Sequence, residues 1–136
     1  MLKEFIWPSR VYYEDTDHGG VVYYANYLKF MERARTEWLR SLGFEQDRLS
    51  EDDGMIFAVR SVEMKYLSPA RFNDLLEVTA RVIKYGRASI DFEQQVRRNG
   101  EVLCEGVVRL ASLDAKHFRP RPASQQLIER LNEERS

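Results

Sequence analysis

Apolar and polar residues alternate along the second half of the chain, which is the period-two pattern of β-strands with one buried face. The alternating segments are residues 61–66, 76–82, 88–97 and 101–113. Apolar groups occupy both faces of the last segment, so we expect it to lie in the interior of a sheet. Tyr85-Gly86-Arg87 and Asn99-Gly100 separate the last three segments as hairpin turns, and the second is a type I′ signal.

The pattern becomes helical over residues 25–42, where apolar residues recur at spacings of three and four. These apolar residues are Leu28, Met31, Ala34, Trp38 and Leu42. Asn26 is the expected N-cap, and Gly43 stands where a left-handed residue ends a helix. At about 1.5 Å per residue, this helix is roughly 27 Å long.

The sequence also predicts two shorter elements, one at each end of the chain. Residues 4–13 are expected to form a first strand, and residues 122–134 a short polar helix. The apolar face of the first strand consists of Phe5, Trp7, Val11 and Tyr13. Pro8 places this strand at an open edge, because proline donates no ladder hydrogen bond.

The element order is therefore strand, long helix, four strands and short helix, which predicts an α+β fold. In this arrangement one helix covers the apolar face of a single curved antiparallel sheet of five strands. One helix leaves much of such a sheet exposed. We therefore expect a second copy of the chain to cover the sheet edges or its outer face.

The composition fits a single domain spanning residues 1–136. The chain has 136 residues (16.1 kDa), 43% of them hydrophobic and 32% charged, which suffices for one core but not two. No segment is apolar enough for a membrane span, and the N-terminal MLKEFIWPSR lacks the apolar region of a secretory signal. We therefore expect a cytoplasmic protein. Cys104 is the only cysteine, which excludes an internal disulfide and a multi-cysteine metal site.

The balance of charge and the missing motifs narrow the function. Lys and Arg total 21 and Asp and Glu total 22, a balance that argues against a nucleic-acid-coating protein. The chain has no G-x-G-x-x-G or P-loop motif, so no cofactor is expected. It also has no G-x-S-x-G motif, and Cys104 is interpreted as a small core residue rather than a nucleophile.

The most unusual segment is YEDTDHGGVVYYANY, residues 13–27. Three carboxylates are followed by two glycines and then by the expected start of the long helix. Glycines let a backbone approach a ligand closely, and a helix start presents unpaired N–H groups with partial positive charge. A carboxylate facing such donors is a minimal site for acyl transfer, because it supplies an attacking group or base opposite an oxyanion hole.

Other interpretations of this segment compete with the catalytic one. An acidic run before a helix is commonly a capped turn. A calcium loop fits poorly, because Gly19 occupies its fifth position and Asn26 its twelfth, where a bidentate glutamate is expected, so no metal site is predicted. His18 either tunes the neighbouring Asp17 or is a bystander, and His117 is expected at the surface.

The segment also resembles a known family. Tyr-Glu-Asp-Thr-Asp-x-Gly-Gly-Val-Val-Tyr, followed by Ala-Asn-Tyr-Leu and Phe-Met-Glu-Arg-Ala-Arg-Thr-Glu, is similar to hotdog-fold acyl-CoA thioesterases of the 4-hydroxybenzoyl-CoA thioesterase type. Residues 66–74 and 85–89 resemble the branch associated with the Tol-Pal cell-envelope system. The resemblance covers about residues 5–115 and implies a fold in which a curved antiparallel sheet wraps one helix.

The resemblance implies roles for residues of the loop. Asp17 matches the catalytic carboxylate, the backbone N–H near Tyr24 matches the oxyanion donor, and Tyr13 matches a pocket tyrosine. Gly20 and Val22 belong to the same substrate-binding segment. Many relatives carry a histidine at the position of Tyr24 and a small residue at that of His18. The task of that histidine is therefore lost here, shared by Tyr24 or moved to His18.

Basic residues are candidates to bind the CoA phosphates. The candidates are Lys65, Arg71, Lys84, Arg87, Arg97 and Arg98. Arg87 and Ser89 are the preferred pair, because their hairpin allows close backbone approach. Another hotdog branch uses a helix glutamate as its catalytic acid. Glu32 lies on the expected helix but only six residues after Asn26, so a supporting or structural role is favoured here.

The predicted function is hydrolysis of an acyl-CoA thioester to a free acid and CoA, without a cofactor, in a homo-oligomer (a dimer or a homotetramer). Asp17 acts as nucleophile or as general base. One alternative is a module that binds acyl-carrier protein or scaffolds envelope partners with little catalysis. Another is a dehydratase or hydratase of the same architecture, for which His18 is the only plausible histidine.

Overall fold

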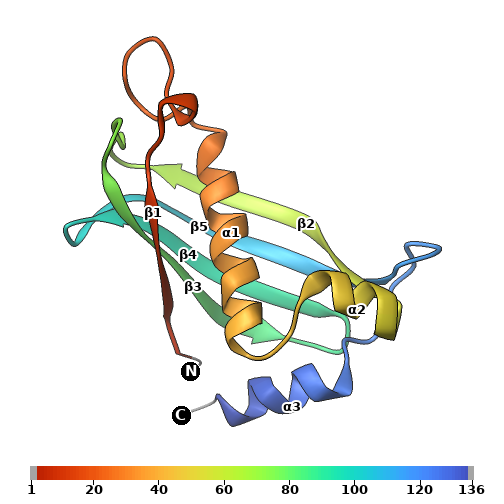
Figure 1. Ribbon diagram of the computed structural model, residues 1–136. Coiled ribbons are helices and arrows are strands. Elements are labelled where there is room, and N and C mark those ends of the chain that lie inside the picture. Colours follow the sequence, from red (N-terminus) through yellow and green to blue (C-terminus); the bar gives the residue numbers. More distant parts are fainter. Residues whose placement is uncertain (1–2, 135–136) are drawn as a thin grey trace.

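The computed structural model describes residues 3–134 and consists of one antiparallel sheet that curves around a long helix (Figure 1). The strands are β1 (Phe5–Arg10), β2 (Met55–Tyr66), β3 (Leu75–Tyr85), β4 (Ser89–Arg98) and β5 (Glu101–Asp114). The helices are α1 (Asn26–Ser41), α2 (Gln46–Asp53), α3 (Gln125–Glu133) and a 3-10 turn, η1 (Tyr13–Asp15). The strand order is β1-β3-β4-β5-β2, which confirms the predicted five-stranded α+β arrangement.

The sheet follows the predicted hairpins. β3, β4 and β5 are antiparallel neighbours, and β5 pairs on both sides. Asn99 (φ 50°) and Gly100 (φ 83°) both lie in the left-handed region, as a type I′ turn requires. β1 is an edge strand in which Pro8 lies opposite Glu77, so the proline is placed as predicted.

Helix α1 ends where the sequence predicted but begins differently. Gly43 has φ 94°, its N–H donates to the Arg40 carbonyl, and the Phe44 N–H donates to the Leu39 carbonyl. This is a Schellman C-cap. The expected N-cap was wrong: Ala25 occupies that position, and the Asn26 side chain instead donates to the Asp15 carbonyl at 2.9 Å.

The predicted buried face of α1 needs one correction. Met31, Ala34 and Trp38 are buried, whereas Leu28 is exposed and Tyr27 is buried instead. The apolar stripe therefore enters the core one residue earlier than predicted. Tyr27 also satisfies a buried polar group, because its hydroxyl accepts the Ala70 N–H at 3.0 Å.

Three other expectations about the elements were incomplete. Helix α2 was missed because Leu49 is its only buried residue among polar neighbours, although Gly54 ends it with φ 64°. β2 begins at Met55 rather than at residue 61. Its first half was missed because the residues before 61 are mostly apolar and do not alternate with polar ones. The first strand ends at Arg10 and the chain turns into η1, so Tyr13 leaves the strand and is exposed. Trp7 lies within the edge strand β1 but is exposed rather than buried.

Two hydrophobic cores lie between α1 and the sheet. The loop-end core, near the start of α1, includes Val11, Tyr27, Phe30, Met31, Leu76 and Cys104. The far-end core includes Trp38, Leu49, Met55, Phe92, Leu127 and Leu131, and both α2 and α3 contribute to it. Buried polar residues, Arg35, Gln94 and Thr79, occur on the same helix and strands as the cores.

Candidate active site

The loop between η1 and α1 is a tight, hydrogen-bonded turn. The Asp17 N–H donates to the Val21 carbonyl at 2.9 Å, and the Gly20 N–H donates to the Asp17 carbonyl at 3.1 Å. Gly20 has φ 78°, a conformation that glycine adopts without the steric cost of a side chain. The loop is also tied to the segment before β3, because the buried Val22 donates its N–H to the Ala70 carbonyl at 2.8 Å.

The Asp17 carboxylate is exposed near the tip of this loop. Its Oδ1 accepts the Gly19 N–H at 2.8 Å, and no other hydrogen bond or ion pair joins it to the described residues. A Cβ at Gly19 would lie 3.3 Å from this Oδ1, so glycine leaves room beside the carboxylate. His18 is exposed on the same loop, next to Asp17.

Asp15 fixes the loop to the start of α1 and has a structural role. Its side chain is buried, and Oδ2 accepts the Tyr12 N–H at 2.8 Å. Its carbonyl accepts both the Tyr23 N–H at 3.0 Å and the Asn26 amide. Among residues 3–134, the backbone N–H groups of Tyr24 and Ala25 have no backbone acceptor. Two unpaired donors therefore stand just before α1, on the segment that follows the Asp17 loop.

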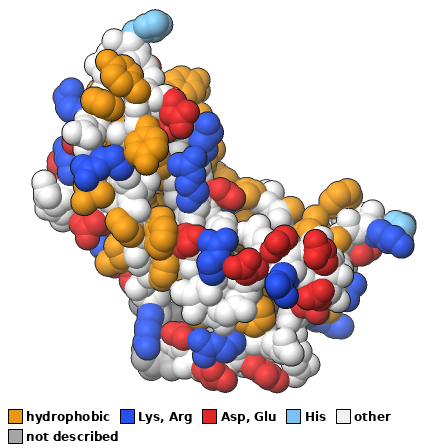
Figure 2. Space-filling view, in the orientation of Figure 1, with side chains coloured by type: hydrophobic (Ala, Val, Ile, Leu, Met, Phe, Trp, Pro, Cys, Tyr) orange, Lys and Arg blue, Asp and Glu red, His pale blue; other side chains and the backbone are white. Residues whose placement is uncertain are grey.

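Aromatic side chains surround this end of the molecule, and several are exposed. Tyr66 lies between Tyr24 and Tyr27, with ring centroids 6.0 Å and 5.5 Å apart, respectively. Tyr13 is 79% exposed and packs on Phe72 at 4.7 Å. Figure 2 shows hydrophobic side chains gathered at the surface over the end where α1 begins. Burial raises the pKa of Tyr66 and of Tyr27, so both hydroxyls remain protonated at neutral pH.

The predicted basic residues fall into three places. Arg71 is exposed and lies beside the loop, since its backbone forms a β-bridge with Val21. Arg97 pairs with Glu4, and Arg98 with Asp74, so these two guanidinium groups are already engaged. Of the others, Lys65 lies on β2 next to Tyr66, at the loop end of the sheet, and Lys84 lies near the end of β3 that is remote from the loop.

Arg87 and Ser89 lie at the opposite end of the sheet from Asp17. They belong to the β3–β4 hairpin, whereas the Asp17 loop contacts the segment before β3. β3 has 11 residues, so about 35 Å of strand separates the two sites. Within one chain, Arg87 and Ser89 are therefore not brought together with Asp17.

Other nucleophile or metal chemistry gains no support from the described residues. Cys104 is buried, and burial raises the pKa of its thiol to about 12, as expected for a core cysteine. His117 is exposed in the turn after β5. Between residues 3 and 134 no three His, Cys, Asp or Glu side chains are grouped to hold a metal ion. Nor is any helix in that range both long and apolar enough to cross a membrane.

Two polar residues that the sequence reasoning missed are buried between α1 and the sheet. Arg35 donates to the Gln94 Oε1 at 2.9 Å. The signal for Arg35 was present, because it stands four residues after Met31 and three before Trp38 and so lies on the buried face of the helix.

This fold and loop define a class of protein, which the comparisons with known proteins identify. Residues 19–105 match the model of the Thioesterase superfamily. The chain is 46% identical over 116 residues to acyl-CoA thioesterase YbgC of Haemophilus influenzae, covering 85% of each chain. It is 40% identical over 125 residues to acyl-CoA thioester hydrolase YbgC of Escherichia coli, covering 91% of this chain and 92% of that one.

Solved structures agree with the sequence comparisons. A probable thioesterase from Bartonella henselae superposes with a TM-score of 0.86 at 33% identity, covering 90% of this chain and all of that chain (100%). A DHNA-CoA thioesterase from Staphylococcus aureus has a TM-score of 0.89 at 24% identity, which supports the fold. The chain belongs to the Thioesterase superfamily, and the hotdog fold implied by the resemblance is confirmed.

Proposed function

We propose that this protein hydrolyses an acyl-CoA thioester to a free acid and CoA. The substrate class comes from the names of its relatives in Haemophilus influenzae and Escherichia coli. The observation that carries the mechanism is the pair of unpaired N–H groups on Tyr24 and Ala25, on the segment that joins the Asp17 loop to α1. Such donors stabilise the negative charge that develops on the thioester oxygen.

Asp17 supplies the reacting carboxylate. In one route it attacks the thioester carbon, CoA leaves as the thiolate, and water then hydrolyses the mixed anhydride. In the other it takes a proton from the water that attacks the same carbon directly. Exposed Arg71 lies beside the loop and is the basic residue of the same chain best placed to meet a CoA phosphate. Because CoA thioesters are metabolites of the cytoplasm, the proposed activity belongs there.

We further propose that a second copy completes the site. β2 is an edge strand of 12 residues, and Val59 on it is 54% exposed. A long unprotected edge of this kind pairs readily with another strand. Antiparallel pairing of two β2 edges would turn the second copy end for end. Its β3–β4 hairpin, with Arg87 and Ser89, would then lie at the same end of the joint sheet as Asp17 of the first copy.

Asp17→Asn tests the chemistry directly. Asparagine keeps the oxygen that accepts the Gly19 N–H but lacks the carboxylate, so folding is preserved while thiol release falls by about 10²–10⁴-fold. Glu14→Gln is the matched control, since Glu14 is an exposed carboxylate three residues away, and its activity should stay near that of the parent. The assay measures thiol release from short, long and aromatic acyl-CoA esters.

The outcomes separate the alternatives. Near-normal turnover in the Asp17→Asn variant refutes the role of Asp17. An absence of thiol release with every ester, together with tight binding of acyl-carrier protein, favours the binding module or envelope scaffold over the enzyme. Release of water from a hydroxyacyl-CoA without thiol release would favour a dehydratase.

Mixed oligomers test the shared site. Asp17→Asn subunits and Arg87→Ala subunits are each expected to have low activity as pure preparations. After the two are unfolded and refolded together, mixed dimers would contain one site with neither change, and activity should return toward about a quarter of the parent value for random pairing. No recovery would contradict the sharing of Asp17 and Arg87 between subunits.

A further inference from the structure

A cavity of about 120 Å³ opens between α1, the start of α2 and the concave face of the sheet. It is well above the roughly 15 Å³ that one water molecule requires. Apolar side chains from four elements, α1, β2, β4 and β5, form much of its wall, among them Trp38, Phe57 and Leu110. The residues of the Asp17 loop do not line it, so it is a separate feature of the far end of the molecule.

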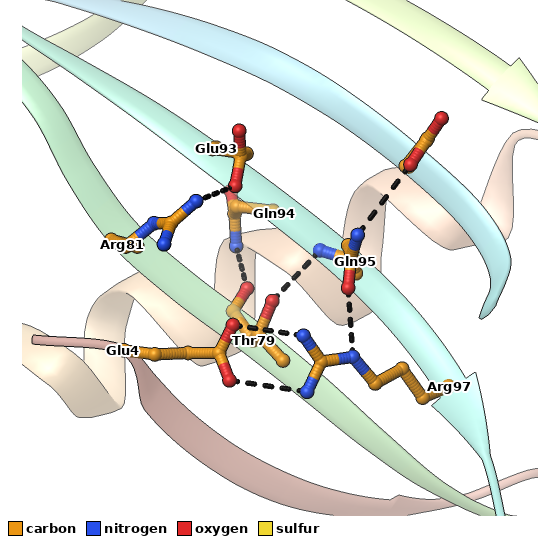
Figure 3. Close-up of polar contacts among 8 residues, drawn as sticks. Glu4, Thr79, Arg81, Glu93, Gln94, Gln95 and Arg97 are labelled. Atoms are coloured by element: carbon orange, nitrogen blue, oxygen red, sulfur yellow. Dashed lines mark hydrogen bonds and ion pairs between the residues drawn. The ribbon is translucent and has the colours of Figure 1, made fainter. Parts of the chain in front are cut away.

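One wall of this cavity carries a buried guanidinium group. Arg35 is only 9% exposed, and its Nη1 donates to the Gln94 Oε1 at 2.9 Å. Gln94 is held in turn, because its Nε2 donates to the carbonyls of Met31 and Thr79, both at 3.0 Å. Figure 3 shows Gln94 pointing from β4 toward Thr79 of β3. The amide therefore fixes the guanidinium in one position against the sheet.

Among residues 3–134, no carboxylate forms an ion pair with Arg35, although the negative charge of Glu32 is near enough to favour the charged guanidinium. No carboxylate of that range lies within 4.0 Å of its nitrogens, and its single hydrogen bond there uses one of five N–H donors. Glu32 also lines the cavity but is exposed and forms no ion pair with Arg35. Buried charges are normally paired, because desolvation of an isolated charge is costly.

The unused N–H groups of Arg35 are open to the cavity rather than sealed in protein. Within the described part of the chain, the fully buried side-chain polar atoms that lack a partner are Arg81 Nε and Ser112 Oγ. The nitrogens of Arg35 are not among them, so they retain accessible surface where the residue lines the cavity. Arg35 is thus a positioned donor that faces an open volume.

We propose that this cavity binds a small carboxylic acid, with the carboxylate on Arg35 and an apolar body against Trp38 and Phe57. A planar guanidinium matches a carboxylate through two parallel hydrogen bonds, and the aromatic walls accept hydrocarbon. A strongly hydrated phosphate gains little from such walls. A free acid of this kind is also the product of the proposed thioester hydrolysis, and this link to the product, unlike the binding site itself, rests on the proposed function.

Thermal unfolding of the full chain with added ligand tests the proposal. The probes are butyrate, hexanoate and benzoate, each compared with its neutral amide and with sodium chloride at equal ionic strength. A ligand that binds only the folded state raises the unfolding temperature with concentration. We expect the carboxylates to raise it and the amides and chloride to leave it unchanged.

Two substitutions on α1 identify the residue responsible. Arg35→Met keeps the length of the side chain without its charge and should abolish the carboxylate shift. Arg33→Met removes an exposed arginine from the same helix and should leave the shift intact. Equal shifts in the Arg35→Met and parent proteins, or equal binding of acids and amides, would overturn the proposal.

A third variant keeps the test decisive even where Arg35→Met does not fold. Glu32→Gln leaves Arg35 in place and removes the negative charge that shares the cavity, so it should tighten carboxylate binding by a few-fold. Unchanged or weaker binding would count against the site. So would an oligomer structure with a side-chain carboxylate of a second copy on Arg35. None of these binding measurements needs turnover, so their outcome is independent of the role of Asp17.

Discussion

The two ends of the molecule are built from the same helix and sheet, yet they differ in how completely they are covered. At the far end, α2 and α3 close over the core and bury Leu49, Leu127 and Leu131. At the loop end Tyr27 is buried, but Tyr13, Tyr24 and Phe72 around the start of α1 are exposed, with Tyr24 at 60%. Figure 1 shows both short helices at the end of α1 remote from the Asp17 loop.

This difference indicates a division of labour along α1. Apolar surface removed from water stabilises the fold, so a covered end contributes more per side chain than an open one. An open aromatic surface instead remains available to a substrate or to a second copy. The far end therefore carries much of the stability, while the loop end keeps the groups proposed for chemistry accessible.

The largest expected effect is on stability, at the far end. Phe92→Ala removes a fully buried ring that packs edge-on against Trp38 at 5.1 Å. It should lower the free energy of unfolding by about 3–5 kcal/mol, measured by urea denaturation. Tyr13→Ala, at the exposed loop end, is the control and should change it by less than about 0.5 kcal/mol. Similar losses for both changes would show that the loop end is covered in solution.

Most of the fold was predictable because its signals are local. Hairpin turns, period-two alternation and the glycine at the end of α1 each depend on a few neighbouring residues. The turns and the glycine were confirmed, and so were the strands, but on β2 the face expected to be buried is open, with Val62 and Tyr66 exposed. α2 was not predictable, because a helix of eight residues with only Leu49 buried is stabilised by tertiary packing rather than by its own pattern. The exposed Trp7 on β1 shows that alternation predicts which residues share a face, but not whether that face is covered.

The candidate site was predictable only as far as its chemistry is contiguous in sequence. Asp17 and the start of α1 lie within ten residues of each other, so motif and backbone geometry could be considered together. The substrate-binding pair Arg87 and Ser89 is remote along the sheet, and only the assembly decides whether it joins the site. Arg35 was overlooked because its meaning depends on Gln94, which is distant in sequence and meets it only in the fold.

Replacing a glycine of positive φ at each end by alanine should have a smaller effect, and one that differs between the two ends. Gly43 (φ 94°) ends α1 beside the far-end core, and Gly20 (φ 78°) shapes the Asp17 loop. Each change to alanine costs about 1–2 kcal/mol locally, because a side chain disfavours this conformation. Gly43→Ala should lower the free energy of global unfolding and spare thiol release. Gly20 is exposed, so in Gly20→Ala the loop should change conformation to relieve the strain, which reduces thiol release with little change in unfolding. The reverse result would refute the division of labour.

The smallest expected effect is a pH dependence that differs between the ends. Burial alone raises the pKa of Asp74, but the Arg71 N–H at 2.8 Å and the Arg98 guanidinium at 2.7 Å together hold it below its ordinary value. At the far end the Lys116 N–H, followed by that of His117, lowers the pKa of Asp114. A depressed pKa means that each carboxylate stabilises the fold above the unfolded-state pKa near 4 and loses that contribution as the pH falls.

Salt should separate these two contributions. The Asp74 carboxylate relies partly on a charged partner, and this ion pair contributes under about 1 kcal/mol to the free energy of unfolding. Sodium chloride at 1 M should screen part of that contribution. Asp114 relies on backbone N–H groups, so its contribution should persist. Unfolding free energies from pH 6 to pH 2, with and without salt, should therefore show a salt-dependent loss that Asp74→Asn removes and Asp114→Asn does not. If Asp74→Asn left the salt response unchanged, the loop end would draw no measurable stability from this ion pair. The acid sensitivity of the loop end would then have to come from other carboxylates near α1.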